Sequence, residues 1–327
     1  MNIVYCIGNG FDIAQGLKTQ YCDFYDQYTN RYPISISPSA KKLRKSIKSD
    51  YKTWADLEMG LGEYTINLNE DDHDEAYFDL SDSLREHLKN EERRFWPNAT
   101  RKDEVIGDLV TPYKTLLERD AAEISSILDQ RPSETIHINI ISFNYTTTLE
   151  KIHPEHESVH ICNLTNHNVY LDNIYHIHGT LDFAMIMGVN DSDQIRNEAF
   201  HNNPNICDVL VKPQSNEAIR SNNVVICEKL IAEADLIVIF GMSIGETDKL
   251  WWQLIGATLL RKNAKLIIFE HLDKPIDFTR AQKIGAKRKE VINRFISKIN
   301  FRPDFIDIIS SRIYVNFSTD FLAPHKN

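Results

Sequence analysis

Apolar residues gather in short runs at the amino terminus and again in the second half of the chain. The clearest runs, Ile3–Ile7, Ile136–Ile141, Leu236–Phe240 and Leu266–Phe269, are rich in β-branched residues and apolar on both faces. This pattern is typical of parallel strands that are covered by helices on both sides of a sheet. Weaker strand patterns occupy 159–162, 174–178, 184–189 and 313–317. Together they predict an α/β fold with a Rossmann-like, mostly parallel sheet and helices on both faces.

A different pattern fills the stretch from about residue 40 to residue 131. Charge rises there, and apolar residues recur at helical spacing in 54–68, 77–95 and 105–128. We therefore expect a helical insertion at 40–131 within a nucleotide-binding core made of 1–39 and 132–327. Inside the insertion, the acidic run Glu70–Glu75 favours a solvated loop between helices over a metal site. The polar excursion 190–221 is typical of a functional lid or a disordered loop.

The composition narrows the class of protein. The chain has 327 residues, of which 42% are hydrophobic and 26% are charged, as in ordinary globular proteins. Its 37 basic and 47 acidic residues give a formal charge of −10, which disfavours a nucleic-acid partner. Five scattered cysteines without a C-x-x-C pair argue against disulfides and structural zinc. Without a targeting segment or an apolar run of about 20 residues, we expect a cytoplasmic protein with no membrane partner.

Candidate chemistry begins at the end of the first predicted strand, where Gly8-Asn9-Gly10-Phe11-Asp12 follows Ile7. Glycines directly after a buried strand let the backbone approach a phosphate, and the next helix start offers free amides. The pattern is not a complete G-x-G-x-x-G, and no acidic residue closes a second strand about 20 residues later. The loop therefore predicts either a nucleotide phosphate site or a tight turn.

Two further polar groups follow predicted strands. Asn144 lies at the rim where open α/β sheets bind ligands, unless it serves only the turn. Thr147 and Glu150 have capping-box spacing at the next helix start. His178 ends a weaker strand on the same face as His176, and the following glycine leaves room for a ligand. An imidazole there suits proton transfer near neutral pH, although histidines at strand ends also serve structure.

The fourth polar loop contains Gly241, Ser243 and Asp248. The glycine amide and the serine hydroxyl can bind a ribose or a phosphate. Asp248 falls in the first turn of the next helix, where a carboxylate favours the helix dipole and need have no other role. Because parallel strands bring their carboxyl ends to one edge of a sheet, we expect the four loops to form a single nucleotide cleft without a metal.

Several short motifs occur together along the chain. They are Gly8-Asn9-Gly10-Phe11-Asp12 with Gly16, Leu17, Thr19, Tyr21 and Phe24, then Trp54-Ala55-Asp56-Leu57-Glu58, Phe143-Asn144-Tyr145-Thr146, His178-Gly179, and Gly241-Met242-Ser243 with Asp248. In this combination the chain resembles the bacterial AbiH family of phage abortive-infection proteins. The resemblance runs from the first strand to about residue 252.

That family resembles a divergent branch of the sirtuin-type fold, which is a Rossmann-like sheet that binds NAD. The resemblance implies that the loop 8–12 holds the pyrophosphate, that Asn144 orients the nicotinamide ribose and a water, and that His178 is the base. It places Gly241 and Ser243 near the adenosine half, and it adds Thr19, Tyr145 and Asp248 to the nucleotide-binding residues. Two departures are Asn9, in place of a small residue, and the lack of a four-cysteine zinc module. Protein deacylation is therefore not expected.

The leading hypothesis is an antiviral NAD glycohydrolase that hydrolyses NAD to nicotinamide and ADP-ribose. Nicotinamide leaves as a neutral molecule, so the acid that glycosidases use to protonate the leaving oxygen is not required. A phage-derived trigger fits this hypothesis, and self-association as a homo-oligomer would suit a dormant toxic enzyme. Two alternatives stay open. One is a non-catalytic module that senses NAD or ADP-ribose and regulates a partner. The other is a nuclease whose metal is held by Asp12, Asp56, Glu58 and Asp248.

Overall fold

The computed structural model describes residues 1–30, 36–131, 133–154, 157–164, 166–272, 280–317 and 320–324. Within these residues, one seven-stranded sheet has the order β3-β4-β2-β1-β5-β6-β7. The strands are β1 (Asn2–Ile7), β2 (Ile136–Ser142), β3 (Val159–Leu164), β4 (His167–His176), β5 (Leu236–Phe240), β6 (Lys265–Phe269) and β7 (Ile313–Asn316). β3 pairs antiparallel with β4, and the other neighbours pair in parallel. The predicted α/β class with a mostly parallel sheet is confirmed.

Two apolar cores lie on opposite faces of the sheet. On β1, Ile3, Tyr5 and Ile7 face the first core, whereas Val4 and Cys6 face the second. The first core is covered by α1 (Gly10–Ala14), α6 (Ala99–Val110), α7 (Glu118–Asp129) and α8 (Thr148–Ile152). The second is covered by α11 (Asn223–Glu233), α12 (Lys249–Lys262), α13 (Ala281–Ile296) and α14 (Pro303–Ser310). Burial on both faces explains why the strand sequences lack the alternation of a half-exposed sheet.

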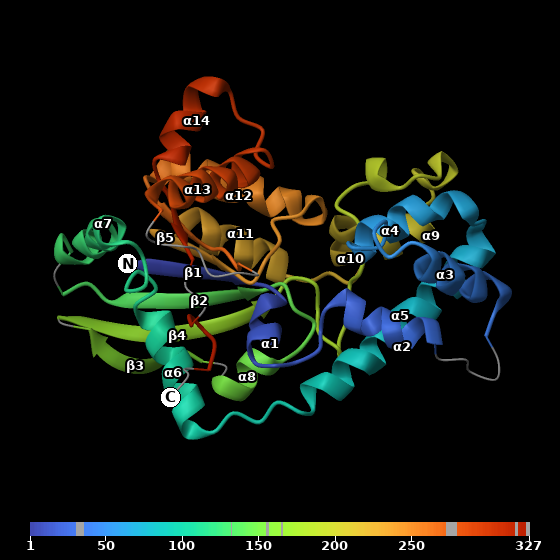
Figure 1. The fold of residues 1–327 in the computed structure, drawn as a ribbon, viewed down its shortest axis with the longest axis horizontal. Coiled ribbons are helices and arrows are strands. Elements are labelled where there is room, and N and C mark those ends of the chain that lie inside the picture. Colours follow the sequence, from blue (N-terminus) through green and yellow to red (C-terminus); the bar gives the residue numbers. More distant parts are fainter. Residues whose placement is uncertain are drawn as a thin grey trace.

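A third apolar core belongs to a helical lobe that Figure 1 shows beyond one end of the sheet. The lobe contains α2 (Tyr21–Asn30), α3 (Pro38–Ser49), α4 (Leu57–Tyr64), α5 (Glu70–Glu92), α9 (Pro204–Leu210) and α10 (Lys212–Ala218). Short 3-10 helices are η1 (Thr65–Asn67), η2 (Ser192–Gln194), η3 (Glu198–Phe200) and η4 (Glu246–Asp248). Residues 40–131 therefore supply both the lobe, through α3 to α5, and the cover of the sheet, through α6 and α7. The predicted domain boundaries themselves stay a prediction.

Three local predictions were wrong. The segment 184–189 is not a strand: Ala184 has a positive φ of 50°, which extended backbone does not adopt, and within this segment Val189 makes an isolated bridge to Val211. β4 ends at His176, so His178 lies in the loop beyond it. The run Glu70–Glu75 is not a loop but the start of α5, where acidic residues are stabilised by the positive end of the helix dipole.

Candidate functional site

The sheet brings the four predicted loops to one edge. β4, β2, β1 and β5 are neighbours in the sheet and run parallel, so the loops after His176, Ser142, Ile7 and Phe240 leave the same edge side by side. From β1 the chain builds the sheet outward through β2 and β4, and it later returns to the other side of β1 with β5. Such a reversal of strand order opens a crevice at the carboxyl ends of the strands, where α/β proteins bind ligands.

The glycines of the first loop pack against the fourth loop. A Cβ on Gly10 would lie 2.3 Å from the Cα of Gly241, and a Cβ on Gly8 would lie 2.7 Å from the Gly241 carbonyl oxygen. The amide of Gly8 donates to the Phe240 carbonyl and that of Gly10 to the Gly241 carbonyl, each at 2.9 Å. Gly241 itself has a φ of 70°, which favours glycine. These glycines therefore serve the close contact of two loops, and the amides of Gly8 and Gly10 already have protein acceptors.

The other polar residues of the first loop also have partners inside the protein. Asn9 is exposed, and its side chain donates to the Thr19 carbonyl at 2.8 Å and accepts from the Thr19 hydroxyl at 2.5 Å. Phe11 is fully buried in the first core. Asp12 is buried too, and it accepts from the hydroxyls of Thr146 at 2.6 Å and Thr148 at 2.5 Å. Burial raises the pKa of Asp12 to about 6, despite these two hydrogen bonds.

His176 is held on both of its ring nitrogens. Its Nδ1 lies 2.8 Å from the backbone oxygen of Asn144, and its Nε2 lies 2.7 Å from Glu150 Oε1. A carbonyl can only accept, so Nδ1 carries a hydrogen. Burial by itself lowers the pKa of His176, but the hydrogen bond and the negative charge of Glu150 outweigh it and raise that pKa. The ring of His176 thus joins the backbone of Asn144 to Glu150.

The same contact replaces the capping box that Thr147 and Glu150 predict. Thr147 precedes α8 but makes no capping hydrogen bond with its side chain. Its backbone amide and hydroxyl instead donate to Glu92. The prediction was wrong because Glu150 is drawn to His176, which neighbours it in space but not in sequence.

His178 differs from His176 in having one ring nitrogen without a partner. Its Nε2 lies 3.0 Å from Asp248 Oδ1, and its ring packs edge-on against Phe143. Among the residues that the structure describes, nothing hydrogen-bonds to His178 Nδ1 or to the side-chain Nδ2 of Asn144, although both atoms are buried. Buried polar atoms without partners are uncommon in native proteins, and they mark places where a ligand or water completes the hydrogen bonds.

Asp248 does not act as a plain charge at a helix start. It is the last residue of η4 and directly precedes α12, and its side chain makes no capping hydrogen bond. Burial by itself raises the pKa of Asp248, but the Lys212 ammonium and His178 hold it well below its usual range. The charged carboxylate therefore accepts from His178 Nε2. A histidine ring that carries its hydrogen on Nε2 alone has a lone pair on Nδ1.

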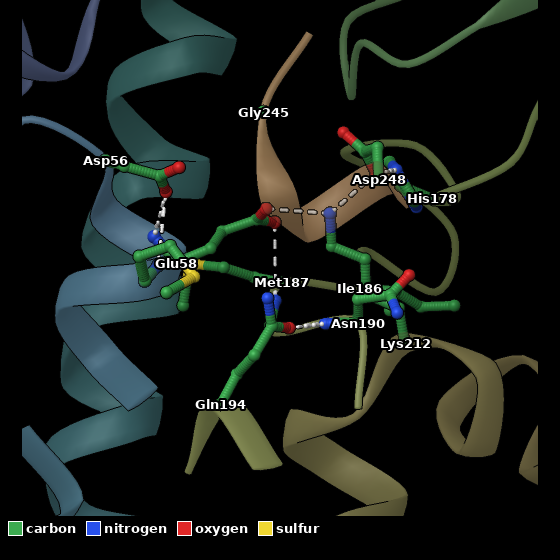
Figure 2. Close-up of polar contacts among 12 residues, drawn as sticks. Asp56, Glu58, His178, Ile186, Met187, Asn190, Gln194, Lys212, Gly245 and Asp248 are labelled. Atoms are coloured by element: carbon green, nitrogen blue, oxygen red, sulfur yellow. Dashed lines mark hydrogen bonds and ion pairs between the residues drawn. The ribbon is translucent and has the colours of Figure 1, made fainter. Parts of the chain in front are cut away.

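Sequence reasoning missed Lys212, which lies at the first residue of α10. Its Nζ lies 2.7 Å from Glu58 Oε2 and 3.0 Å from Asp248 Oδ1. Figure 2 shows the ammonium between the two carboxylates, with His178 next to Asp248. Burial lowers the pKa of Lys212, but the two carboxylates outweigh it and hold that pKa above its usual value. The sequence offered one signal, an isolated Lys-Pro pair in the excursion 190–221, which indicated no more than a turn.

The remaining predicted contacts divide between the interior and the surface. The Tyr145 hydroxyl donates to the Ile186 carbonyl at 2.9 Å and lies 3.3 Å from Glu58 Oε1. Ser243 is exposed at the end of the β5 loop. The structure thus brings His178 and Asp248 together, places Phe143, which precedes Asn144, against the His178 ring, and gives Tyr145 a place beside Glu58.

The carboxylates of the nuclease alternative do not form one cluster. Asp12 binds two threonines, and Asp56 caps α4 by accepting from the amides of Glu58 and Met59. Glu58 and Asp248 meet at Lys212. Over the described ranges, no group of three or more histidine, cysteine, aspartate or glutamate side chains could hold a metal ion. In the same part of the chain, none of the helices has the length and apolarity needed to cross a membrane.

The chain belongs to the class of doubly wound α/β proteins. At the carboxyl edge of its sheet lies a buried polar site, in which two nitrogen atoms have no hydrogen-bond partner among the described residues. The sequence model of the family described as Bacteriophage abortive infection AbiH matches residues 4–270, which is most of the chain. The chain therefore belongs to the AbiH family, and its role is in phage abortive infection. A search of curated proteins gave no match.

Proposed function

We propose that the protein serves abortive infection by hydrolysing NAD to nicotinamide and ADP-ribose. The observation that carries this proposal is the pairing of His178 Nε2 with Asp248, while the buried His178 Nδ1 has no hydrogen-bond partner among the described residues at the carboxyl edge of the sheet. The side-chain Nδ2 of Asn144, for which the described part of the chain also offers no partner, belongs to the neighbouring strand end. A proton acceptor and an orienting amide at the carboxyl edge of the sheet, where α/β proteins bind ligands, suit the hydrolysis of a nucleotide.

The chemistry needs few protein groups. The bond between the nicotinamide nitrogen and C1′ of the ribose breaks, and nicotinamide leaves as a neutral molecule with the electron pair. Asn144 orients the attacking water, whose oxygen forms the new bond to C1′. His178 Nδ1 takes the proton of that water and later releases it to solvent. Correct orientation supplies much of the rate in such a step.

The proposal has a requirement for access. Asn144 and His178 are 6% and 5% exposed, so a nucleotide reaches them only after the surrounding segments move. If a trigger is needed to move these segments, the enzyme stays dormant in the uninfected cell, where the trigger is absent. The exposed Asn9 and Ser243 are our assigned contacts for the pyrophosphate and the adenosine half, whereas Phe11 and Asp12 serve internal packing.

The test is a product assay with purified protein, NAD and lysate from infected or uninfected cells. We expect nicotinamide and ADP-ribose in equal amounts from the wild type, and a loss of roughly 100-fold or more for His178→Ala and Asn144→Ala. The matched control is His137→Ala, because His137 also pairs with a carboxylate, Asp172, at the other end of β2. This control should retain full activity.

The assay also separates catalysis from sensing. Calorimetry with NAD and with ADP-ribose measures binding by each of the same variants. Binding by the wild type without product under both lysate conditions would contradict hydrolysis and support the sensing module. Equal product from wild type and His178→Ala would contradict the assigned base.

A further inference from the structure

We propose that Lys212 is a positioning residue that neutralises and fixes Asp248, so that His178 stays uncharged with Nδ1 available as a base. The inference rests on the proposed function, because it assigns the base role to His178. It adds a requirement from a segment that sequence reasoning left out of the site. Lys212 belongs to the lobe, whereas His178 and Asp248 belong to the edge of the sheet.

The first argument is the geometry of the ammonium. Lys212 Nζ and His178 Nε2 both lie 3.0 Å from the same oxygen, Asp248 Oδ1. The Lys212 side chain is 5% exposed, and those of Glu58 and Asp248 are 8% and 17% exposed. In such a buried place, charges interact strongly because water screens them little. The charge on Lys212 therefore acts directly on the carboxylate that orients His178.

The second argument is the balance of charge around His178. Among the described residues, the charged groups near it are Asp248 from η4, Lys212 from α10 and Glu58 from α4. Burial raises the pKa of Glu58, but the contact of 2.7 Å with the Lys212 ammonium favours its charged form. Tyr21 and Tyr145 lie close to the same carboxylates, and burial raises the pKa of both hydroxyls, so they add no charge. With Lys212, the three groups sum to one negative charge. Without it, two carboxylates would draw a second proton onto the His178 ring, and Nδ1 would no longer accept one.

The third argument is that the lobe does not need the Lys212 charge to hold α10 in place. The backbone amide of Lys212 donates to the Val189 carbonyl at 2.9 Å, and the Val189 amide donates to the Leu210 carbonyl at 2.8 Å. Leu210 and Val211 are buried in the third core. Backbone hydrogen bonds and apolar packing thus fix the start of α10, and the side-chain ammonium is left to act on the site.

The kinetic test compares Lys212→Met with Lys212→Arg in the NAD assay. We expect Lys212→Met to lower kcat by roughly 10- to 100-fold with little change in KM, because the base is lost while the binding surface stays. Lys212→Arg restores a positive charge and should recover a large part of kcat. The control is Lys298→Met, because Lys298 pairs with Glu246 on η4, the same short helix that ends at Asp248. It should behave as wild type.

A second measurement does not depend on NAD. Imidazole ¹⁵N chemical shifts, with the His178 signals identified by their loss in His178→Asn, report which ring nitrogens carry hydrogen. At pH 7.5 we expect a neutral ring protonated at Nε2 in the wild type and in Lys298→Met, and an imidazolium in Lys212→Met. If Lys212→Met fails to fold, Lys212→Gln keeps amide donors for Glu58 and Asp248 without the positive charge and should give the same imidazolium.

The two measurements separate the two proposals. A change of the His178 nitrogen signals in Lys212→Met without NAD turnover by any protein would support the role of Lys212 and contradict the proposed function. A His178 ring that stays neutral in the variants without the Lys212 charge would overturn the role of Lys212, whether or not the wild type hydrolyses NAD.

Discussion

At the scale of single residues, two histidines of the same short motif differ in their hydrogen-bond partners. His176 and His178 lie two positions apart, and the sequence predicts the same face for both. The structure gives His176 partners on both nitrogens and leaves Nδ1 of His178 without one among the described residues. The partners that decide this, Glu150 and Asp248, come from other elements, so the difference could not be predicted from the motif.

Asp12 carries a prediction on stability and pH. Its pKa is raised from 3.8 to about 6 by burial. Between these values the folded protein binds more protons than the unfolded chain, so the free energy of unfolding falls as the pH rises. The Asp12 contribution to this fall is about 2 kcal/mol between pH 4 and pH 7. Asp12→Asn should lack it, since an amide can still pair with the hydroxyls of Thr146 and Thr148.

Urea unfolding of both proteins from pH 4 to pH 8 checks this expectation. The stability of Asp12→Asn relative to wild type should rise with pH and level off above pH 6 to 7. Other titrating groups, such as His176, are present in both proteins and largely cancel. A difference that stays flat with pH would show that Asp12 ionises as it does in the unfolded chain.

At the scale of elements, the strands were predictable and the caps were not. β1, β2, β5 and β6 are apolar on both faces because helices cover both sides of the sheet, and this burial is written into consecutive residues. The turn after β2 was placed correctly, but its predicted capping box does not form. Whether a side chain caps a helix depends on the other groups that compete for its hydrogen bonds. A competing group that is distant in the sequence leaves no local pattern.

The contact between the first and fourth loops carries a prediction on packing. Gly10→Ala places a Cβ 2.3 Å from the Cα of Gly241, where only backbone can give way. We expect it to lower the free energy of unfolding by about 1–3 kcal/mol. Gly285→Ala in α13 is the control, since a Cβ there meets nothing within 4 Å. Alanine should stabilise that helix by roughly 0.5–1 kcal/mol.

Chemical denaturation of the two variants measures both effects. Gly10→Ala should also weaken NAD binding, because the two loops border the crevice. Wild-type stability in Gly10→Ala would mean that the loops separate freely.

At the scale of the whole molecule, the excursion 190–221 is part of the lobe rather than a free lid. Phe200, Ile206 and Leu210 share the third core with α4 and α5. The amide of Arg196 donates to the Gly62 carbonyl at 3.0 Å, which ties the excursion to α4. The two parts of the lobe come from opposite halves of the sequence. Because they share one apolar core, we expect them to open and close together.

Gly62→Ala tests this coupling. A Cβ on Gly62 would lie 2.4 Å from the Gln194 carbonyl oxygen and 2.9 Å from Val189 Cγ1. Hydrogen exchange measured by mass spectrometry should therefore speed up in peptides covering 186–211, with no change in β5 or β6. The control is Gly107→Ala in α6, where a Cβ meets nothing within 4 Å. If exchange in 186–211 stays slow in Gly62→Ala, the excursion is docked by other contacts.

The sequence by itself determined the class of the sheet, the four polar loops at its strand ends and the family. These features are local or repeat along the chain: burial on both faces shows in consecutive residues, and each loop follows its own strand directly. The two residues proposed for hydrolysis, Asn144 and His178, were found in this way. Membership of the AbiH family followed from short motifs that keep their order.

The tertiary structure decided which partners each polar group of the site has. Glycines that predicted a phosphate loop pack two loops together, and Asp248 orients a histidine instead of serving a helix end. Lys212 enters the site from a segment with no motif, because a charge buried between two carboxylates depends on three-dimensional neighbours. Hydrogen bonds and desolvation act over a few ångströms in space. The residues that take part in them can lie far apart in the sequence, so a local motif does not reveal them.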